Sequence, residues 1–189
     1  MTLELAQENK IKVDGKGFEK ELSKHQELSR TASAGKFKSG LADNSEATSK
    51  LHTATHLLHA ALKKVLKDDS IIQRGSNINP ERARFDFNFD RKLTDDEKKE
   101  IEALVNKWIK QSVKVCREEM SPEQAKKKGA SGIFDAKYGD KVSVYTIGSI
   151  ASDICTGPHA ENTKDLGKFK IKKEESSSSG VRRIKAILK

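Results

Sequence analysis

The stretch Leu51-His-Thr-Ala-Thr-His-Leu-Leu-His-Ala-Ala-Leu62 carries two patterns at once. Its apolar residues recur at helical spacing and predict a helix over residues 46–67 with a broad buried face. Ser45, just before this segment, has a side chain of the type that caps helix N-termini. His52 and His56 are four residues apart, so both imidazoles project from one side of the predicted helix.

A second motif, Cys155-Thr-Gly-Pro-His159, offers a thiolate and a third imidazole on a tight loop. Zinc prefers nitrogen and sulfur donors, about four of them in tetrahedral geometry. Either motif alone is weak evidence, because most such histidine pairs lie on surfaces or in cores. Together His52, His56, Cys155 and His159 predict a Zn2+ site, with a metal-free core as the alternative. The zinc has either three protein ligands plus a water molecule or all four residues as ligands.

The rest of the chain mixes helical and strand patterns without regular alternation between them. Ala83 to Phe89 alternates apolar and polar residues strictly, which predicts a strand. Thr94-Asp-Asp-Glu97 is a capping box that predicts a helix to about Gln111. We also expect strands at 71–78, 113–116, 142–147, 169–173 and 181–188, a short helix after Ser121 and a loop at Glu174–Gly180. These elements indicate an α+β fold with a largely antiparallel sheet packed with helices.

The first 44 residues have the pattern of a peripheral segment. Gly17 to Arg30 is a charged helix with a thin apolar stripe, and Thr31 to Asn44 has the composition of a linker. We therefore expect a peripheral helix and linker at 1–44 and a zinc-binding domain at 45–189. The N-terminal sequence is typical of the interior of a longer protein.

The composition favours a polyanionic partner. Lys and Arg number 37 against 28 Asp and Glu, which gives a net charge of +9. Nucleic acid is the simplest partner for that charge, and a lysine-rich soluble surface is the alternative. Two cysteines are too few for a disulfide framework, which favours a reducing, cytoplasmic compartment. No stretch approaches the roughly 18 apolar residues of a transmembrane helix, so no membrane partner is expected.

In this order, the motifs resemble the editing domain of alanyl-tRNA synthetase and its free-standing AlaX relatives. The resemblance covers residues 45–189 and includes Gln73-Arg-Gly-Ser76, Arg84-Phe-Asp-Phe87 and Gly180-Val-Arg-Arg-Ile184 beside the two zinc motifs. It implies that family's curved, antiparallel fold and a zinc-dependent aminoacyl-tRNA deacylase. The implied reaction is hydrolysis of mischarged tRNA(Ala), chiefly Ser-tRNA(Ala), with Gly-tRNA(Ala) as a further substrate. The implied partners are the acceptor end of tRNA(Ala) and the remainder of the synthetase chain.

The resemblance leaves two alternatives open. Pro158 stands where the alanyl pattern commonly has threonine, and this proline is typical of the threonyl-tRNA synthetase editing domain, which would act on Ser-tRNA(Thr). A non-catalytic, zinc-stabilised tRNA-binding module is the second alternative. No aminoacylation domain is recognised in this sequence, so we expect no charging activity.

The resemblance also implies roles for individual side chains. Gln73 matches a polar pocket residue that hydrogen-bonds the substrate, and Thr55 matches a position that senses the seryl hydroxyl. The alternatives are a strand-edge glutamine and an ordinary helix threonine. His59 is expected to be an ordinary helix histidine rather than a support for the zinc ligands, and Cys116 a buried, structural cysteine.

The basic C-terminal region is the expected nucleic-acid contact. Its lysines and arginines would bind phosphates without reading bases, and the alternative is that about half of them simply face solvent. The residues expected to make this contact are Lys168, Lys170, Lys172, Arg182 and Arg183.

Overall fold

The computed structural model describes residues 14–33, 40–132 and 139–189 of the chain, and only the backbone of residues 25–33. The chain divides into two compact units, residues 1–38 and 39–189. None of the described helices combines the length and the apolar character that crossing a lipid bilayer requires.

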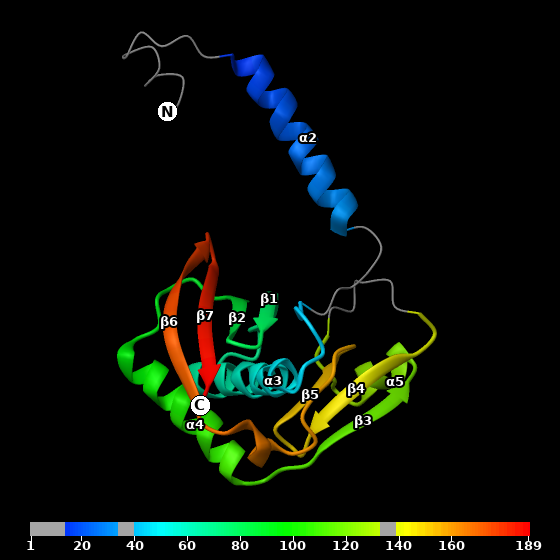
Figure 1. The fold of residues 1–189 in the computed structure, drawn as a ribbon, viewed down its shortest axis with the longest axis vertical. Coiled ribbons are helices and arrows are strands. Elements are labelled where there is room, and N and C mark those ends of the chain that lie inside the picture. The colour runs from blue at the N-terminus through cyan, green and yellow to red at the C-terminus, as the bar shows by residue number, and fades with distance from the viewer. Residues whose placement is uncertain (1–13, 34–39, 133–138) are drawn as a thin grey trace. The chain divides into compact units, whose positions relative to one another are not determined.

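The first unit contains the helix α2 (Gly15–Ser33), which matches the helix predicted over Gly17 to Arg30 (Figure 1). Much of the predicted segment 1–44, namely residues 1–13 and 34–39, lies outside the described residues. Residues 40–44, which were assigned to the linker, belong to the second unit.

The helix α3 (Glu46–Leu66) runs through the second unit between its two sheets (Figure 1). Ser45 caps it by accepting a hydrogen bond from the Thr48 N–H, and Lys67 ends it in the left-handed region at φ 53°. The predicted apolar face is fully buried at Leu57, Leu58, Ala61 and Leu62. This face packs into the main core of the protein.

The helix α4 (Asp95–Lys110) contacts α3 and begins at the predicted capping box. The Thr94 hydroxyl accepts from the Glu97 N–H, and the Glu97 carboxylate accepts from the Thr94 N–H. The residues of α4 that point into the core are Ile101, Val105, Trp108 and Ile109.

Four strands form an antiparallel sheet in the order β1-β2-β7-β6. Their bounds are β1 (Gln73–Asn79), β2 (Arg82–Asn88), β7 (Val181–Leu188) and β6 (Phe169–Ser178). The alternation predicted for β2 holds for Phe85 and Phe87, which are buried in the core, and for Arg84 and Asn88, which are not. Asp86 departs from it, because its pairing with Arg183 buries this carboxylate on the polar face. The α+β class and the antiparallel pairing are confirmed.

The loop predicted at Glu174–Gly180 is wrong for most of its length. β6 continues to Ser178, because the backbone of this polar stretch pairs with the start of β7, as between Glu175 and Arg183. Backbone pairing there does not need apolar side chains, so the polar composition concealed a strand. The turn reduces to Ser179 and Gly180, where Gly180 adopts a positive φ of 67°.

A second antiparallel sheet has the order β3-β4-β5. It consists of β3 (Val115–Met120), β4 (Val142–Ile147) and β5 (Ala151–Ile154), with α5 (Pro122–Lys127) between β3 and β4 and a 3-10 turn, η1 (Thr163–Leu166), after β5. β5 was not predicted. Cys116 is exposed rather than buried, because β3 is an edge strand whose middle residues face solvent.

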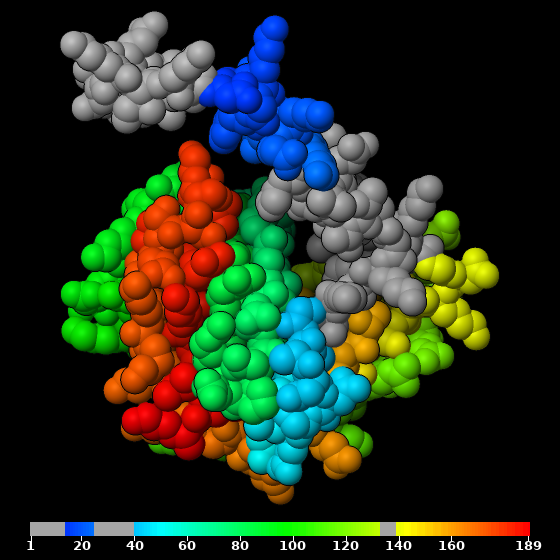
Figure 2. All heavy atoms as spheres, turned by 45° about the horizontal axis from the view of Figure 1, so that its top comes forward, coloured from blue at the N-terminus to red at the C-terminus, as the bar shows by residue number. Residues whose placement is uncertain are grey.

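The segment Gly40–Ala42 lies along the free edge of β1. The Ile78 N–H donates to the Gly40 carbonyl and the Ala42 N–H donates to the Ile78 carbonyl, both at 2.8 Å. Leu41 forms a parallel bridge with Ile78. Figure 2 shows the start of the cyan segment beside the green strands β1 and β2, with the orange and red β6–β7 hairpin on their other side.

We expect Asn106→Leu to lower the free energy of unfolding by about 1–3 kcal/mol, the usual cost of buried polar groups left without partners. The Asn106 amide donates to the Phe169 carbonyl and accepts from the Phe169 N–H, each at 2.9 Å, and so fastens α4 to the start of β6. Urea denaturation measures the change. The exposed neighbour Lys107 supplies the control Lys107→Leu, and equal unfolding free energies for the two variants would contradict the assigned role.

Candidate metal centre

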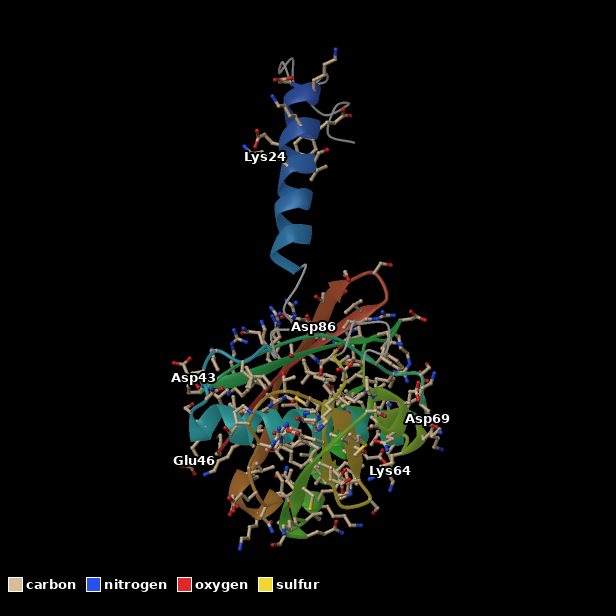
Figure 3. The ribbon with its side chains drawn as sticks, turned by 90° about the vertical axis from the view of Figure 1, so that its right-hand side faces the viewer. Lys24, Asp43, Glu46, Lys64, Asp69 and Asp86 are labelled. Atoms are coloured by element: carbon tan, nitrogen blue, oxygen red, sulfur yellow. The ribbon has the colours of Figure 1, made fainter. Side chains whose placement is uncertain are left out.

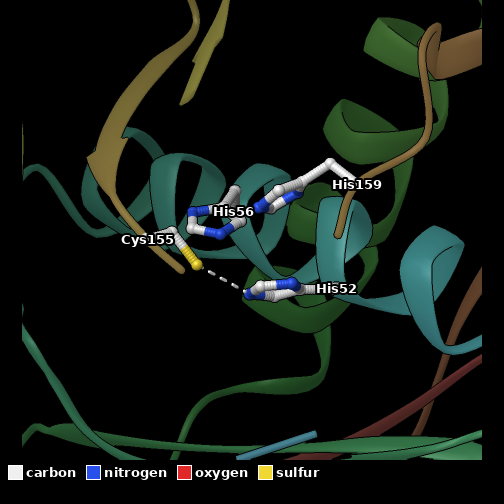
Figure 4. Close-up of side chains that lie close together, drawn as sticks. All are labelled: His52, His56, Cys155 and His159. Atoms are coloured by element: carbon white, nitrogen blue, oxygen red, sulfur yellow. Dashed lines mark hydrogen bonds between the residues drawn. The ribbon is translucent and has the colours of Figure 1, made fainter. Parts of the chain in front are cut away.

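The two predicted zinc motifs meet at one point in the second unit. His52 and His56 lie on successive turns of α3, Cys155 directly follows β5, and His159 lies on the loop that leaves it (Figure 4). One ligand atom from each residue, the thiol sulfur or a ring nitrogen, lies within 4.8 Å of the other three. The His52 Nε2–Cys155 Sγ distance is 3.1 Å. Four donors of the types that zinc prefers therefore surround a common centre.

Each of the three imidazoles is held from behind through its Nδ1 atom. His52 Nδ1 lies 3.0 Å from the Pro158 carbonyl, and His56 Nδ1 lies 2.8 Å from Asp153 Oδ2. The Pro158 carbonyl and the ionised Asp153 carboxylate can only accept hydrogen bonds. The Nδ1 atoms of His52 and His56 therefore carry protons and donate them. Ring orientation and tautomer are thereby set for these two histidines.

Thr53 holds the His159 ring in the same way, by accepting a hydrogen bond from Nδ1. Its hydroxyl donates to the Ser49 carbonyl and accepts from the Ala160 N–H, so the oxygen is available to accept from His159 Nδ1 at 3.2 Å. The Nε2 atoms of His56 and His159 are buried, and neither has a hydrogen-bond partner among the described residues. Unpartnered buried ring nitrogens fit a metal ion, because each would otherwise lack an interaction that burial requires.

The charges of the site also fit a cation. Burial alone would raise the pKa of the Cys155 thiol, but the imidazole rings of His159, His52 and His56 around the sulfur lower this pKa to about 3. Burial likewise opposes ionisation of Asp153, yet its pKa is lowered by the charge and hydrogen bond of His56. The site thus holds two anionic groups, a thiolate and a carboxylate. A divalent cation would neutralise both.

The pKa values of His56 and His159 are shifted by burial and by the same neighbouring charges. Burial disfavours the protonated His56 ring, but Asp153 and Cys155 overcome this effect and raise its pKa to about 10. Burial and the neighbouring histidines His56 and His52 lower the pKa of His159 to about 4, although the nearby Cys155 sulfur acts in the opposite direction. The site therefore stabilises the protonated form of His56 and disfavours protonation of His159. A metal ion bound at the Nε2 atoms would take the place of that proton.

Gly157 lets the Cys155–His159 loop approach α3. A Cβ atom at this position would lie 2.5 Å from Leu41 Cδ1 and 2.7 Å from His52 Cε1, closer than real Cβ atoms approach such groups. Leu41 belongs to the segment that pairs with β1. The loop, a metal-donor ring and the Gly40–Ala42 segment are therefore packed into direct contact.

We expect Gly157→Ala to weaken zinc binding by about tenfold or more, since displaced supports of metal ligands typically cost 10–100-fold in affinity. The added methyl group must push the His52 ring away from the common centre. Competition with a chromophoric chelator measures the dissociation constant. The control is Gly139→Ala, where an added Cβ meets no atom of the described residues within 4 Å, and a variant at Gly157 that binds zinc like this control would contradict the argument.

Asp153 and Thr53 are the functional residues that sequence reasoning missed. Both are buried, and each holds one donor ring. The spacing of Asp153 and Cys155 was the available signal for Asp153, because residues two apart on a strand share a face. His59 Nε2 lies 2.9 Å from the Ile71 carbonyl, and its Nδ1 lies 3.9 Å from Asp153, beyond hydrogen-bond distance.

Thr55 and Gln73 are placed differently from the donors. Thr55 is buried and its hydroxyl donates to the His52 carbonyl at 2.7 Å. Gln73 is exposed at the start of β1, and its amide donates to the Ser76 hydroxyl at 3.3 Å. Among the described residues, neither side chain is hydrogen-bonded to the sulfur or to a ring nitrogen of the four donor residues.

The predicted nucleic-acid contacts fall into two groups. Arg183 donates to both carboxylate oxygens of Asp86 at 2.8 and 2.9 Å, and Arg182 is paired with Glu174. These two guanidinium groups are therefore already engaged within the sheet. The lysines of this group are exposed, at Lys168, Lys170 and Lys172.

Comparison with known proteins identifies a domain family and several similar proteins. Residues 142–185 match the threonyl and alanyl tRNA synthetase second additional domain. Over 188 residues, the whole of this chain, it is 54% identical to an alanine–tRNA ligase of Treponema denticola and 53% identical to one of Borreliella burgdorferi. An alanine–tRNA ligase of Thermotoga maritima is 49% identical over 142 residues, which is 75% of this chain and 16% of that protein.

The chain spans about a third of the length of the first two relatives, 31% and 32% respectively. Its matching residues 142–185 include β4, β5 and the Cys155–His159 loop, and the first zinc motif lies within the region shared with the ligases. The chain is therefore homologous over its whole length to a segment of alanine–tRNA ligases, and its residues 142–185 match the threonyl and alanyl tRNA synthetase second additional domain.

Proposed function

We propose that this chain is a zinc-dependent editing hydrolase that deacylates mischarged tRNA(Ala), chiefly Ser-tRNA(Ala) and also Gly-tRNA(Ala). The observation that carries the proposal is the convergence of His52, His56, Cys155 and His159, with two Nε2 atoms unpartnered, in a segment shared with alanine–tRNA ligases. The partners are the acceptor end of tRNA(Ala) and the rest of a synthetase chain, in the cytoplasm.

The proposed reaction answers a physical limit on amino-acid selection. A pocket for alanine cannot strongly reject serine or glycine, because one small group contributes only about 1–3 kcal/mol of discrimination. A second hydrolytic site removes the errors that pass the first. An alanine–tRNA ligase is the kind of enzyme in which such a site is needed.

The residues of the chain have distinct proposed roles. The four donors would hold Zn2+, which when bound supplies a Lewis acid beside the ester and lowers the pKa of a water molecule. Asp153 and Thr53 keep the His56 and His159 rings in position. Gln73 and Thr55 would recognise the aminoacyl group, Gln73 through its exposed amide and Thr55 through its hydroxyl.

A non-catalytic zinc-stabilised tRNA-binding module is the second candidate. One observation favours it, because four protein donors around one centre fill the tetrahedral sphere of zinc and leave no open position for water. Threonyl-type editing of Ser-tRNA(Thr) is the other alternative. The sequence feature that favours this alternative is Pro158, whose carbonyl lies 3.0 Å from His52 Nδ1.

The experiment that separates these functions is a deacylation assay. The zinc-loaded protein is incubated with Ser-tRNA(Ala), Gly-tRNA(Ala), Ala-tRNA(Ala) and Ser-tRNA(Thr), and release of the amino acid is followed. The proposal expects rapid loss of serine and glycine from tRNA(Ala) and little loss of alanine. Faster hydrolysis of Ser-tRNA(Thr) would favour the threonyl alternative, and tRNA binding without hydrolysis of any substrate would favour the binding module.

A further inference from the structure

A cleft of about 480 Å³ lies beside the metal centre, on the side of His56 that faces Asp153. The last turns of α3 form one wall, and β5 with the turn before it forms the facing wall. Figure 3 shows Lys64 and Asp69, two residues of its rim, at the C-terminal end of α3, opposite Glu46 at its start. Of the four donors only His56 lines this cleft, so the cleft opens onto the side chains behind the donors rather than onto the metal position.

Two of the polar residues that line the cleft are His59 and Asp153. Asp153 uses its Oδ2 atom to hold His56, whose Nδ1 atom lies 2.8 Å away. Its Oδ1 atom faces His59 Nδ1 at 3.9 Å, beyond hydrogen-bond distance, and accepts no hydrogen bond from any residue that the structure describes. The His59 and Asp153 side chains are 11% and 12% exposed, so both are in contact with the cleft rather than sealed off from it.

The other ring nitrogen of His59 determines which atom carries the proton. His59 Nε2 lies 2.9 Å from the carbonyl oxygen of Ile71, which can only accept a hydrogen bond, so Nε2 is the protonated donor. In a neutral imidazole the second nitrogen is then an acceptor. The Phe85 ring lies 5.7 Å from the His59 ring, centroid to centroid, and both Ile71 and Phe85 are buried in the core. The core therefore holds the ring with a lone pair of Nδ1 directed toward Asp153.

Two acceptors that face each other need a donor between them. A neutral His59 Nδ1 and an ionised Asp153 carboxylate both offer only lone pairs, so neither can donate to the other. A water molecule about 2.8 Å from both atoms donates one O–H group to each and satisfies both acceptors. The cleft has room for this molecule, because its volume is far larger than the roughly 30 Å³ that one water molecule occupies.

We infer that a water molecule in this cleft bridges Asp153 Oδ1 and His59 Nδ1, and that His59 is thereby a positioning residue of the metal centre. The bridge holds the second oxygen of a carboxylate whose first oxygen holds the His56 ring. Held at both oxygens, Asp153 keeps one orientation, and the His56 ring keeps its direction toward the common centre of the four donors. The inference rests on the zinc site of the proposed function but not on hydrolysis.

The protonation state of the His59 ring is one test. Long-range proton–nitrogen correlation NMR spectra of the full chain at neutral pH distinguish the two neutral tautomers of a histidine from the doubly protonated ring. The inference expects a neutral His59 with its proton on Nε2. A doubly protonated His59 would pair with Asp153 directly, and a neutral ring with its proton on Nδ1 would be a donor toward Asp153. Either result overturns the inference, and the measurement does not depend on metal.

A double-mutant cycle of zinc affinities tests whether His59 acts through Asp153. His59→Gln keeps an amide that can donate to the Ile71 carbonyl but places no acceptor at the position of Nδ1. In the unchanged chain it should weaken zinc binding about threefold to tenfold, less than the roughly 10–100-fold of a residue that holds a metal-binding histidine directly. In the Asp153→Ala background it should change zinc binding less than about twofold, because the carboxylate that the bridge holds is gone. Chelator competition measures all four dissociation constants.

The matched control is Lys64→Gln, which replaces an exposed side chain on the rim of the same cleft and should leave zinc affinity unchanged. The inference is overturned if His59→Gln weakens zinc binding equally in both backgrounds, if it has no effect in the unchanged chain, or if Lys64→Gln weakens binding as much. A chain that binds no zinc at all would refute the metal centre together with this inference. Normal zinc binding with the expected coupling but no deacylation would refute only the hydrolase proposal.

Discussion

Replacing Cys155 by alanine should abolish both zinc retention and deacylation. The sulfur is the anionic donor of the four, its pKa is held at about 3 by the surrounding histidines, and it lies 3.1 Å from His52 Nε2. Loss of a direct ligand should weaken zinc binding by more than the roughly 100-fold that loss of a supporting residue costs. Zinc content per protein after dialysis against a weak chelator, and serine release from Ser-tRNA(Ala), measure the two effects.

The second cysteine of the chain provides the control. Cys116 is exposed on β3, so Cys116→Ala should keep both zinc and activity. A Cys155→Ala protein that retains one zinc per chain would refute the proposed ligand set. Retained zinc binding by wild-type protein without serine release would instead leave the ligand set in place and favour the binding module.

Asp153→Asn should weaken zinc binding by about 10–100-fold and reduce deacylation by a similar factor, as expected for a carboxylate that supports a metal-binding histidine. The substitution preserves the shape of the side chain but removes its charge, and the amide is a poorer acceptor for His56 Nδ1, which lies 2.8 Å from Oδ2. The His56 ring then loses both its orientation and part of its basicity. Chelator competition gives the zinc affinity, and single-turnover deacylation gives the rate.

The control for this substitution is Asp96→Asn, which alters an exposed pair with Lys99 on α4. Asp96→Asn should bind zinc as the unchanged protein does. If Asp153→Asn also bound zinc normally, Asp153 would be a structural carboxylate that pairs with His56 without supporting the metal.

The grouping of His52, His56, Cys155 and His159 was predictable from the sequence because these donors are rare residue types in local motifs. Helical periodicity placed His52 and His56 on one side of α3, and the Gly-Pro pair indicated a bend between Cys155 and His159. What brings the two motifs together is a fold in which α3 lies against β5. The resemblance to an editing domain supplied that link, whereas spacing alone did not.

The supports of the site were harder to predict for a physical reason. Asp153 and Thr53 act through single hydrogen bonds to rings that lie far away in the sequence or on another element. Thr53 is an ordinary helix threonine until the Cys155–His159 loop is folded against it. β5 has only four residues and no apolar alternation, so nothing in its composition indicated that it positions a carboxylate at the metal donors.

The end of β6 and the exposure of Cys116 were also not predicted, because both depend on which strands become neighbours in the fold. Residues Glu174 to Ser178 form a strand because β7 supplies backbone partners for them, not because their side chains favour one. Cys116 is exposed because β3 ends its sheet, and strand order is not encoded in the local sequence. Alternation predicted β2 correctly, since one face of that strand is buried along its length.

A truncated fragment that began at Ser45 would lack the backbone hydrogen bonds and the parallel bridge that Gly40–Ala42 forms with β1. The cut would remove Leu41 from above Gly157 and His52, and it would leave the edge of β1 open to pairing with another chain. It would also remove Asp43, which accepts hydrogen bonds from the Ser45 and Thr48 hydroxyls at 2.6 and 2.7 Å and so anchors the start of α3. Residues 40–44 therefore support β1, the start of α3 and the Cys155–His159 loop, and we expect a fragment that lacks them to be less stable than one that begins ahead of Gly40.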